Sequence, residues 1–216
     1  MKPTIIYVYD GLCSWCYGFE PQMQALFEQW HATHDFQFVS GGMFPEAQQQ
    51  GIQSILGDNF REAYARVAEY SGAVITEKYL DGLVAQENYI VNSDATARAF
   101  ATFQSYGKTQ AEQLAFIIQL QINIYQNGLN PNGEALYRET AAHFGLSEDD
   151  FLAKMQSEAV QTAVDEAYAY ARALQVNSFP QVFLKTTDER YFQLAKGYTT
   201  ATHISEIIKK IEEEGG

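Results

Sequence analysis

The sequence predicts an α/β fold in which a sheet-forming part is interrupted by a large all-helical insertion. Three observations predict it: a β-α-β pattern at the start, a long central stretch with helical periodicity and little β-rich sequence, and an α-β-β-α pattern at the end. At 216 residues the chain is long enough for one large domain or two small ones. We expect residues 1–44 and 159–216 to form the sheet-bearing domain and residues 45–158 to form the insertion.

The first unit begins with a strand. Residues 4–9 are β-branched and aromatic and lie between Pro3 and a turn at Asp10-Gly11. From Cys13 onward, apolar side chains recur at three- and four-residue spacing, which predicts an amphipathic helix. These positions are Cys16, Phe19, Met23, Leu26, Phe27 and Trp30. A second strand is predicted over residues 36–40, which alternate in polarity.

The remaining elements follow from breaks in the periodic pattern. Glycine, asparagine and proline divide the centre of the chain into helical segments, predicted over 58–70, 94–106, 109–126 and 133–144. Ser147, followed by three acids, marks a further helix start, because a side-chain acceptor and negative charge stabilise a helix N-terminus. The last predicted elements are a helix over 159–174, strands over 181–185 and 191–196, and a helix over 201–213.

The charge balance argues against two classes of partner. The chain has 14 Lys and Arg against 27 Asp and Glu, a net charge of −13. Nucleic acid and anionic membrane surfaces bind clustered basic side chains, so we expect neither as a partner. The apolar run at residues 5–9 is too short for a secretory signal, and no segment approaches the roughly 20 apolar residues that span a bilayer. We therefore expect a cytoplasmic protein.

Cys13 and Cys16 are the only cysteines of the chain. Three residues apart at the start of a helix, they share one face and lie within reach of a reversible disulfide. The unpaired N–H groups of the helix N-terminus stabilise a thiolate on Cys13, which is thus the predicted nucleophile. Cys16, one turn further in, should be more buried and have the higher pKa, as suits a resolving thiol.

Two other interpretations of the cysteine pair stay open. A structural zinc site needs about four ligands, whereas this chain has no second cysteine pair and no two histidines at ligand spacing. We therefore predict no metal and no cofactor. The second interpretation is an inert pair that merely packs in the core, since free cysteine is often buried.

The segment from Asp10 to Pro21 resembles the active-site opening of DsbA-like thioredoxin-fold proteins, and most closely their cytoplasmic, predicted protein-disulfide isomerase or FrnE-like branch. Pro21, five residues after Cys16, matches the proline inside the active-site helix. The helical insertion after the second strand and Phe179-Pro180 before the third match as well. The resemblance implies a thioredoxin fold with a mixed central sheet and a cis bond before Pro180.

The resemblance also implies roles for individual residues. Ser14 and Trp15 occupy the variable dipeptide between the catalytic cysteines, and the backbone of Phe179, next to Pro180, would pair with an extended substrate beside Cys13. These four residues are the predicted substrate-binding or supporting set.

The proton acceptor for Cys16 is left unassigned. Tyr7 stands at the strand position where thioredoxins carry a buried acid. Asp10 and Glu20 are the nearest carboxylates along the sequence.

The leading hypothesis is a thiol-disulfide oxidoreductase that acts on protein or small-molecule thiols and disulfides. One alternative is a glutathione-dependent isomerase or transferase of the kappa and hydroxychromene-carboxylate isomerase type, whose members typically carry serine at the position of Cys13. The other is a non-catalytic DsbA-like adaptor that hands a client to a protease. The sequence predicts no oligomeric state.

Overall fold

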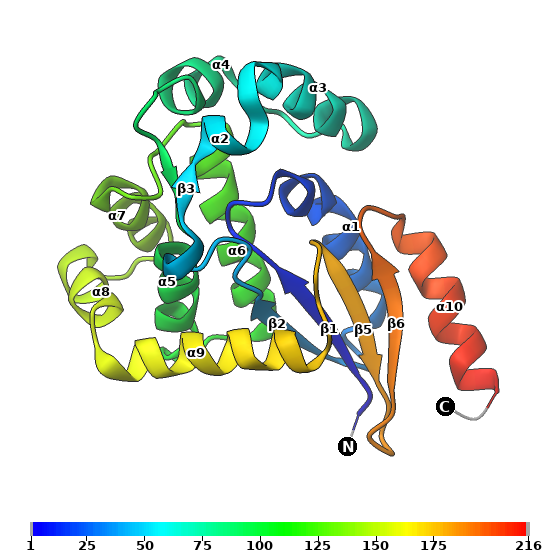
Figure 1. Ribbon diagram of the computed structural model, residues 1–216. Coiled ribbons are helices and arrows are strands. Elements are labelled where there is room, and N and C mark those ends of the chain that lie inside the picture. The colour runs from blue at the N-terminus through cyan, green and yellow to red at the C-terminus, as the bar shows by residue number, and fades with distance from the viewer. Residues whose placement is uncertain (1, 215–216) are drawn as a thin grey trace.

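A four-stranded mixed sheet forms the centre of the computed structural model, which describes residues 2–214. The chain opens with β1 (Thr4–Tyr9), α1 (Ser14–Trp30) and β2 (Asp35–Ser40), and closes with α9 (Glu158–Ala173), β5 (Gln181–Lys185), β6 (Tyr191–Lys196) and α10 (Ala201–Glu213). The strand order is β2-β1-β5-β6, with β2 parallel and β5 antiparallel to β1, and with β6 antiparallel to β5. The predicted mixed sheet and its flanking elements are confirmed (Figure 1).

The two faces of the sheet pack against different helices. In β1, Ile5 and Tyr7 belong to the main core together with side chains of α1 and α10. Ile6 and Val8 point to the opposite face, where Ala171 of α9 covers them. Because every β1 residue after Thr4 is buried, the cysteine-bearing loop that follows this strand starts from a rigid base.

The segment between β2 and α9 is mainly helical and gathers on one side of the sheet (Figure 1). Its longer helices are α3 (Phe60–Ser71), α5 (Asp94–Gln104), α6 (Gln110–Tyr125), α7 (Glu134–His143) and α8 (Glu148–Met155). Its shorter elements are η1 (Glu46–Gln48), α2 (Ile52–Leu56), η2 (Gly57–Asn59), α4 (Glu77–Tyr79) and η3 (Leu80–Val84). The first four of the longer helices lie where the sequence predicts them, to within two residues, and α8 begins directly after Ser147, as predicted.

The segment is not entirely helical, because β3 (Gln50–Gly51) pairs antiparallel with β4 (Ile90–Val91). This two-residue ribbon is too short to leave a periodic signal in the sequence. The division into a domain of residues 1–44 and 159–216 and an insertion of residues 45–158 stays a prediction. Residues 1, 215 and 216 of that division lie outside the described residues.

Helix α6 is one of the parts of this segment that contact the sheet-bearing part, together with α3 and α5. It begins with a capping box: the Thr109 side chain accepts the N–H of Glu112, and the Glu112 carboxylate accepts the N–H of Thr109. Its buried residues include Gln121 and Tyr125 near its C-terminal end. Across residues 2–214, none of the helices combines the length and the apolar character that crossing a membrane requires.

Candidate active site

Cys13 caps the N-terminus of α1. Its backbone is extended, with φ −84° and ψ 110°, and its sulfur accepts the N–H of Cys16 at 3.3 Å. Both thiols are free; Cys13 is 5% exposed, whereas Cys16 is fully buried. A sulfur at this position lies at the positive end of the helix dipole and receives a backbone hydrogen bond.

Cys16 lies in a different environment. Burial raises the pKa of its thiol well above the ordinary value, and the neighbouring Cys13 raises it further. Tyr7 is also fully buried, and its hydroxyl lies 3.5 Å from the carbonyl oxygen of Cys16. Cys16 therefore keeps its proton until another group removes it. Its burial and its raised pKa agree with what the sequence predicts for a resolving thiol.

Phe179 and Pro180 come from the far end of the chain to lie beside the first cysteine. The peptide bond between them is cis, as the resemblance implies. The Cys13 thiol donates to the Phe179 carbonyl oxygen at 3.8 Å. The Phe179 ring lies against Gly41, where an added Cβ would stand only 2.0 Å from a ring carbon. The absence of a side chain at Gly41 thus makes room for this ring.

Asp10 ties the active-site loop, residues 10–13, to the segment that follows β2. One carboxylate oxygen accepts the N–H of Leu12 at 2.9 Å, and the other accepts the N–H of Met43 at 2.7 Å. Burial raises the pKa of Asp10, and these two backbone donors oppose the rise. Asp10 therefore acts here as a positioning group for the loop.

Helix α6 holds the same loop from the other side. The Nε2 of Gln121 lies within hydrogen-bond reach of three loop carbonyl oxygens, those of Asp10 at 3.3 Å, Gly11 at 3.2 Å and Cys13 at 3.4 Å. The Tyr125 hydroxyl donates to the carbonyl oxygen of Leu12 at 2.6 Å. The sequence interpretation missed Gln121 and Tyr125, although a glutamine on the apolar face of α6 was a usable signal.

Glu20 is a second buried acid, one turn beyond Cys16 on α1. Its side chain is 5% exposed, and its Oε1 has no hydrogen-bond partner among the described residues. Burial raises the pKa of this carboxyl well above its ordinary value. Glu20 is therefore set to hold a proton inside the protein.

Ser14 and Trp15 lie at the rim of a cavity of about 220 Å³ beside Cys13. The Trp15 ring is half-buried between two other aromatic rings, with centroids 6.2 Å from Tyr70 and 6.3 Å from Tyr198. The structure thus brings Cys13, Cys16 and Phe179 together and places the dipeptide next to open space.

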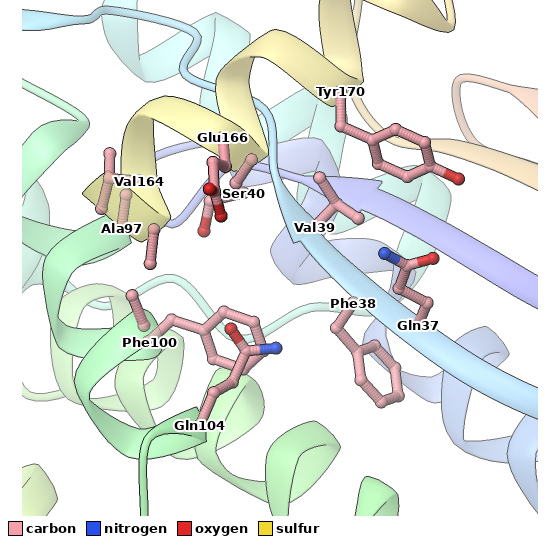
Figure 2. Close-up of a pocket in the computed structure, with 13 residues that line it drawn as sticks. Gln37, Phe38, Val39, Ser40, Ala97, Phe100, Gln104, Val164, Glu166 and Tyr170 are labelled. Atoms are coloured by element: carbon pink, nitrogen blue, oxygen red, sulfur yellow. The ribbon is translucent and has the colours of Figure 1, made fainter. Parts of the chain in front are cut away.

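A second cavity, of about 330 Å³, lies between β2, α5 and α9 (Figure 2). Side chains of Phe100 and Gln104 from α5 and of Val164 and Glu166 from α9 surround it (Figure 2). None of the site residues predicted from the sequence lines it. Within residues 2–214, no group of three or more His, Cys, Asp or Glu side chains is placed to hold a metal ion.

A cysteine pair at a helix N-terminus, beside a cis-proline loop on a mixed four-stranded sheet, defines the class of thioredoxin-fold oxidoreductases and isomerases. The chain belongs to the family described as DSBA-like thioredoxin domain, which matches residues 4–197.

Solved structures agree on the fold. A proposed protein disulfide isomerase from Nitrosomonas europaea is 16% identical with a TM-score of 0.85, and the match covers 100% of each chain. The cytosolic disulfide reductase DsbM from Pseudomonas aeruginosa is 21% identical with a TM-score of 0.77, covering 97% of this chain and 98% of that one. A 2-hydroxychromene-2-carboxylate isomerase is 14% identical with a TM-score of 0.65, covering 97% and 95%. The comparison with curated proteins gave no match.

Proposed function

We propose that this protein catalyses dithiol-disulfide exchange through Cys13-Ser14-Trp15-Cys16. The observation that carries the proposal is the contrast between the two thiols. The Cys13 sulfur caps a helix N-terminus and receives the Cys16 N–H, whereas the Cys16 thiol is fully buried with a raised pKa. Such an arrangement suits one thiol for attack on a substrate and the other for resolving the product of that attack.

The exchange proceeds in two displacements. The Cys13 thiolate attacks one sulfur of a substrate disulfide, the substrate S–S bond breaks, and the other substrate sulfur leaves as a thiolate. Cys16 then gives up its proton and attacks the Cys13 sulfur, which releases the second substrate thiolate. The protein ends with a Cys13–Cys16 disulfide, and the substrate has gained two electrons. The reverse sequence oxidises a substrate dithiol.

Phe179 supports the same reaction as a substrate-binding residue. Its carbonyl oxygen lies 3.8 Å from the Cys13 sulfur, so an extended substrate that pairs with this backbone would bring its own sulfur to Cys13. Pro180 fixes the adjacent backbone, and Ser14 and Trp15 border the space that a substrate enters. These assignments complete the proposed site.

The proposed partners are protein or small-molecule thiols and disulfides, in a cytoplasmic setting. The structural likeness to a cytosolic disulfide reductase, which has also been solved with GSH, supports this choice. We further propose that residues 45–158 are an insertion in a domain of residues 1–44 and 159–216. In this division, the domain carries both cysteines and the insertion supplies Gln121 and Tyr125, which hold the active-site loop.

Replacing Cys13 tests the proposal. Cys13→Ser should abolish reduction of insulin disulfides and refolding of a scrambled disulfide substrate, because no thiol remains that can start the exchange. Cys16→Ser is the matched variant: it should instead accumulate a mixed disulfide on Cys13, detected as an added mass on the intact protein. Wild-type activity in Cys13→Ser would contradict the proposal.

A further inference from the structure

The cavity of about 330 Å³ between β2, α5 and α9, here named the edge cavity, lies along an open edge of the sheet (Figure 2). Strand β2 is the outermost strand in the order β2-β1-β5-β6, so β1 pairs with only one of its two edges. The cavity wall includes four consecutive β2 residues, Gln37, Phe38, Val39 and Ser40. Because consecutive side chains alternate between the faces of a sheet, contact with all four places the cavity at the strand edge itself.

Every second residue of β2 points its backbone groups toward this edge. At one end of the strand the N–H of Asp35 donates to the carbonyl oxygen of Pro3, and at the other end the N–H of Gly41 donates to that of Tyr9. Backbone N–H and C=O groups alternate in direction along a strand, and the bonds of a parallel pair are evenly spaced. The even-numbered residues between these two bonds therefore turn their N–H and C=O groups away from β1.

These even-numbered residues are Phe36, Phe38 and Ser40. The N–H of Phe36 donates to the side-chain Oε1 of Gln110 at 3.0 Å, so a glutamine completes the edge at this position. Within residues 2–214, nothing pairs with the outward backbone groups of Phe38 and Ser40, although these residues are only 3% and 7% exposed. Buried backbone groups cost free energy unless they find a partner. The edge cavity therefore suits an occupant that supplies both donors and acceptors.

The side chains around this edge select the charge of the occupant. In the part of the chain that the structure describes, Glu166 is the only charged residue that lines the edge cavity. It lies on α9, across the cavity from Gln104 of α5 (Figure 2). A positive group placed here gains the attraction of a carboxylate, whereas a negative group is repelled. The net charge of −13 also favours the approach of a cationic partner from solution.

The two helices leave room for an extended chain between them. Small side chains line both walls, Ala97 and Ala101 from α5 and Ala163 and Ala167 from α9. The members of each pair are four residues apart, so both face the cavity from the same side of their helix. The two open positions of β2 lie about 7 Å apart along the strand, which is the length over which about three residues of a second strand can pair.

We propose that the edge cavity binds an extended, positively charged peptide segment of about three residues, which adds to the sheet as a further strand. The segment pairs with the backbone of Phe38 and Ser40 and places its cation at Glu166. Neither cysteine lines this cavity, so the inference goes beyond the proposed function and does not rest on it. Its partner is a protein with an extended basic terminus or loop.

Titration of the isotope-labelled, full-length protein with acetyl-Val-Lys-Val-amide tests the site. We expect saturable shifts of the Phe38 and Ser40 amide resonances, because these groups receive the added strand. Acetyl-Val-Glu-Val-amide should bind about fivefold more weakly, because its carboxylate meets that of Glu166. The lysine peptide methylated at each backbone nitrogen keeps its charge but lacks the donors of a strand. It should leave both resonances in place.

Matched substitutions on α9 locate the site. Ala163 and Ala169 are both exposed on this helix, but Ala163 lines the edge cavity and Ala169 does not. Ala163→Phe should weaken binding of the lysine peptide about tenfold or more, because the ring fills the space, whereas Ala169→Phe should leave binding unchanged. Glu166→Gln should remove the preference for lysine over glutamate. Asp165→Asn, which removes the neighbouring carboxylate outside the cavity, should keep that preference.

Three outcomes would overturn the assignment. The first is an absence of shifts at Phe38 and Ser40 up to about 10 mM lysine peptide, where even a weak complex is mostly formed. The second is equal binding of the methylated peptide, which would show that strand pairing does not hold the ligand. The third is unchanged binding in Ala163→Phe, which would place the peptide elsewhere. None of the three affects the proposed function, which the reduction of insulin by Cys13→Ser tests separately.

Discussion

The active-site loop and the interior beneath it are held in opposite ways. Along residues 10–13, backbone carbonyls and the Asp10 carboxylate meet specific donors from α6 and from the segment after β2. One turn below, Cys16 and Glu20 are buried, and the Glu20 Oε1 has no hydrogen-bond partner among the described residues. The geometry of the loop therefore depends on individual partners, whereas the chemistry beneath it depends on exclusion of water.

Substitutions in the loop and in the interior should therefore have different effects. Loss of a partner around the loop should lower stability and slow the reaction of Cys13, because the thiol would no longer be held beside Phe179. Loss of the buried carboxyl should change how stability depends on pH. Three substitutions test the contrast, in order of decreasing effect.

The largest effect is expected for Gln121→Leu. The substitution removes the donor to the Gly11 carbonyl oxygen and one of the donors to the carbonyl oxygens of Asp10 and Cys13, which keep the backbone N–H groups of Cys13 and Tyr17. These losses together cost about 3 kcal/mol. The free energy of unfolding in urea should fall by that amount, and alkylation of Cys13 by iodoacetamide should slow. Gln119→Leu, on the same helix, removes one bond to the neighbouring Asn123 and should have a much smaller effect. Equal losses in the two variants would show that Gln121 does not hold the loop.

Gly41→Ala should have the next largest effect. The new Cβ would stand 2.0 Å from a carbon of the Phe179 ring, so the ring must move, and we expect the carbonyl of the same residue, beside Cys13, to shift with it. Overpacking of this kind costs about 2 kcal/mol. Reduction of insulin by the variant should slow about tenfold if the position of Phe179 matters as proposed. Gly51→Ala is the matched control, because a Cβ there meets nothing within 4 Å, and it should retain wild-type activity.

The contacts that hold the active-site loop are also what the sequence could not predict. The strands of the four-stranded sheet, the longer helices and the cysteine pair follow from local periodicity and spacing, which short segments carry by themselves. Gln121 contacts residues more than a hundred positions away, and its partners are set by how α6 packs. Its only local signal is a polar side chain beside Leu120 on the buried face of α6.

Gly41 is a second position whose role the sequence could not predict. A glycine pair after a strand is most simply a turn, and the ring that requires the missing side chain comes from Phe179, near the other end of the chain. The short elements α2, α4 and β3 were missed because a few residues carry no measurable period. Contacts between distant segments are thus what the structure adds to the sequence.

At acidic pH the smallest effect is expected for Glu20→Gln, the substitution that tests the interior. Burial raises the pKa of Glu20 in the folded protein above its ordinary value of 4.5, so the folded protein keeps a proton that the unfolded chain has lost. The stability from this group is present below pH 4.5 and is lost as pH rises toward the folded pKa, by about 1.4 kcal/mol per pH unit. Glutamine binds no proton, so the free energy of unfolding of Glu20→Gln should fall less steeply with pH than that of wild type.

Urea unfolding between pH 4 and pH 7 measures the two slopes. Glu28→Gln, an exposed position on the same helix, should leave the wild-type slope in place. A Glu20→Gln slope equal to that of wild type would mean that the carboxyl finds a partner or water in solution. The interior would then be held by specific contacts as the loop is, and the contrast between the two regions would disappear. A flatter slope in Glu20→Gln alone would instead locate the pH dependence in a carboxyl that burial keeps protonated beneath Cys16.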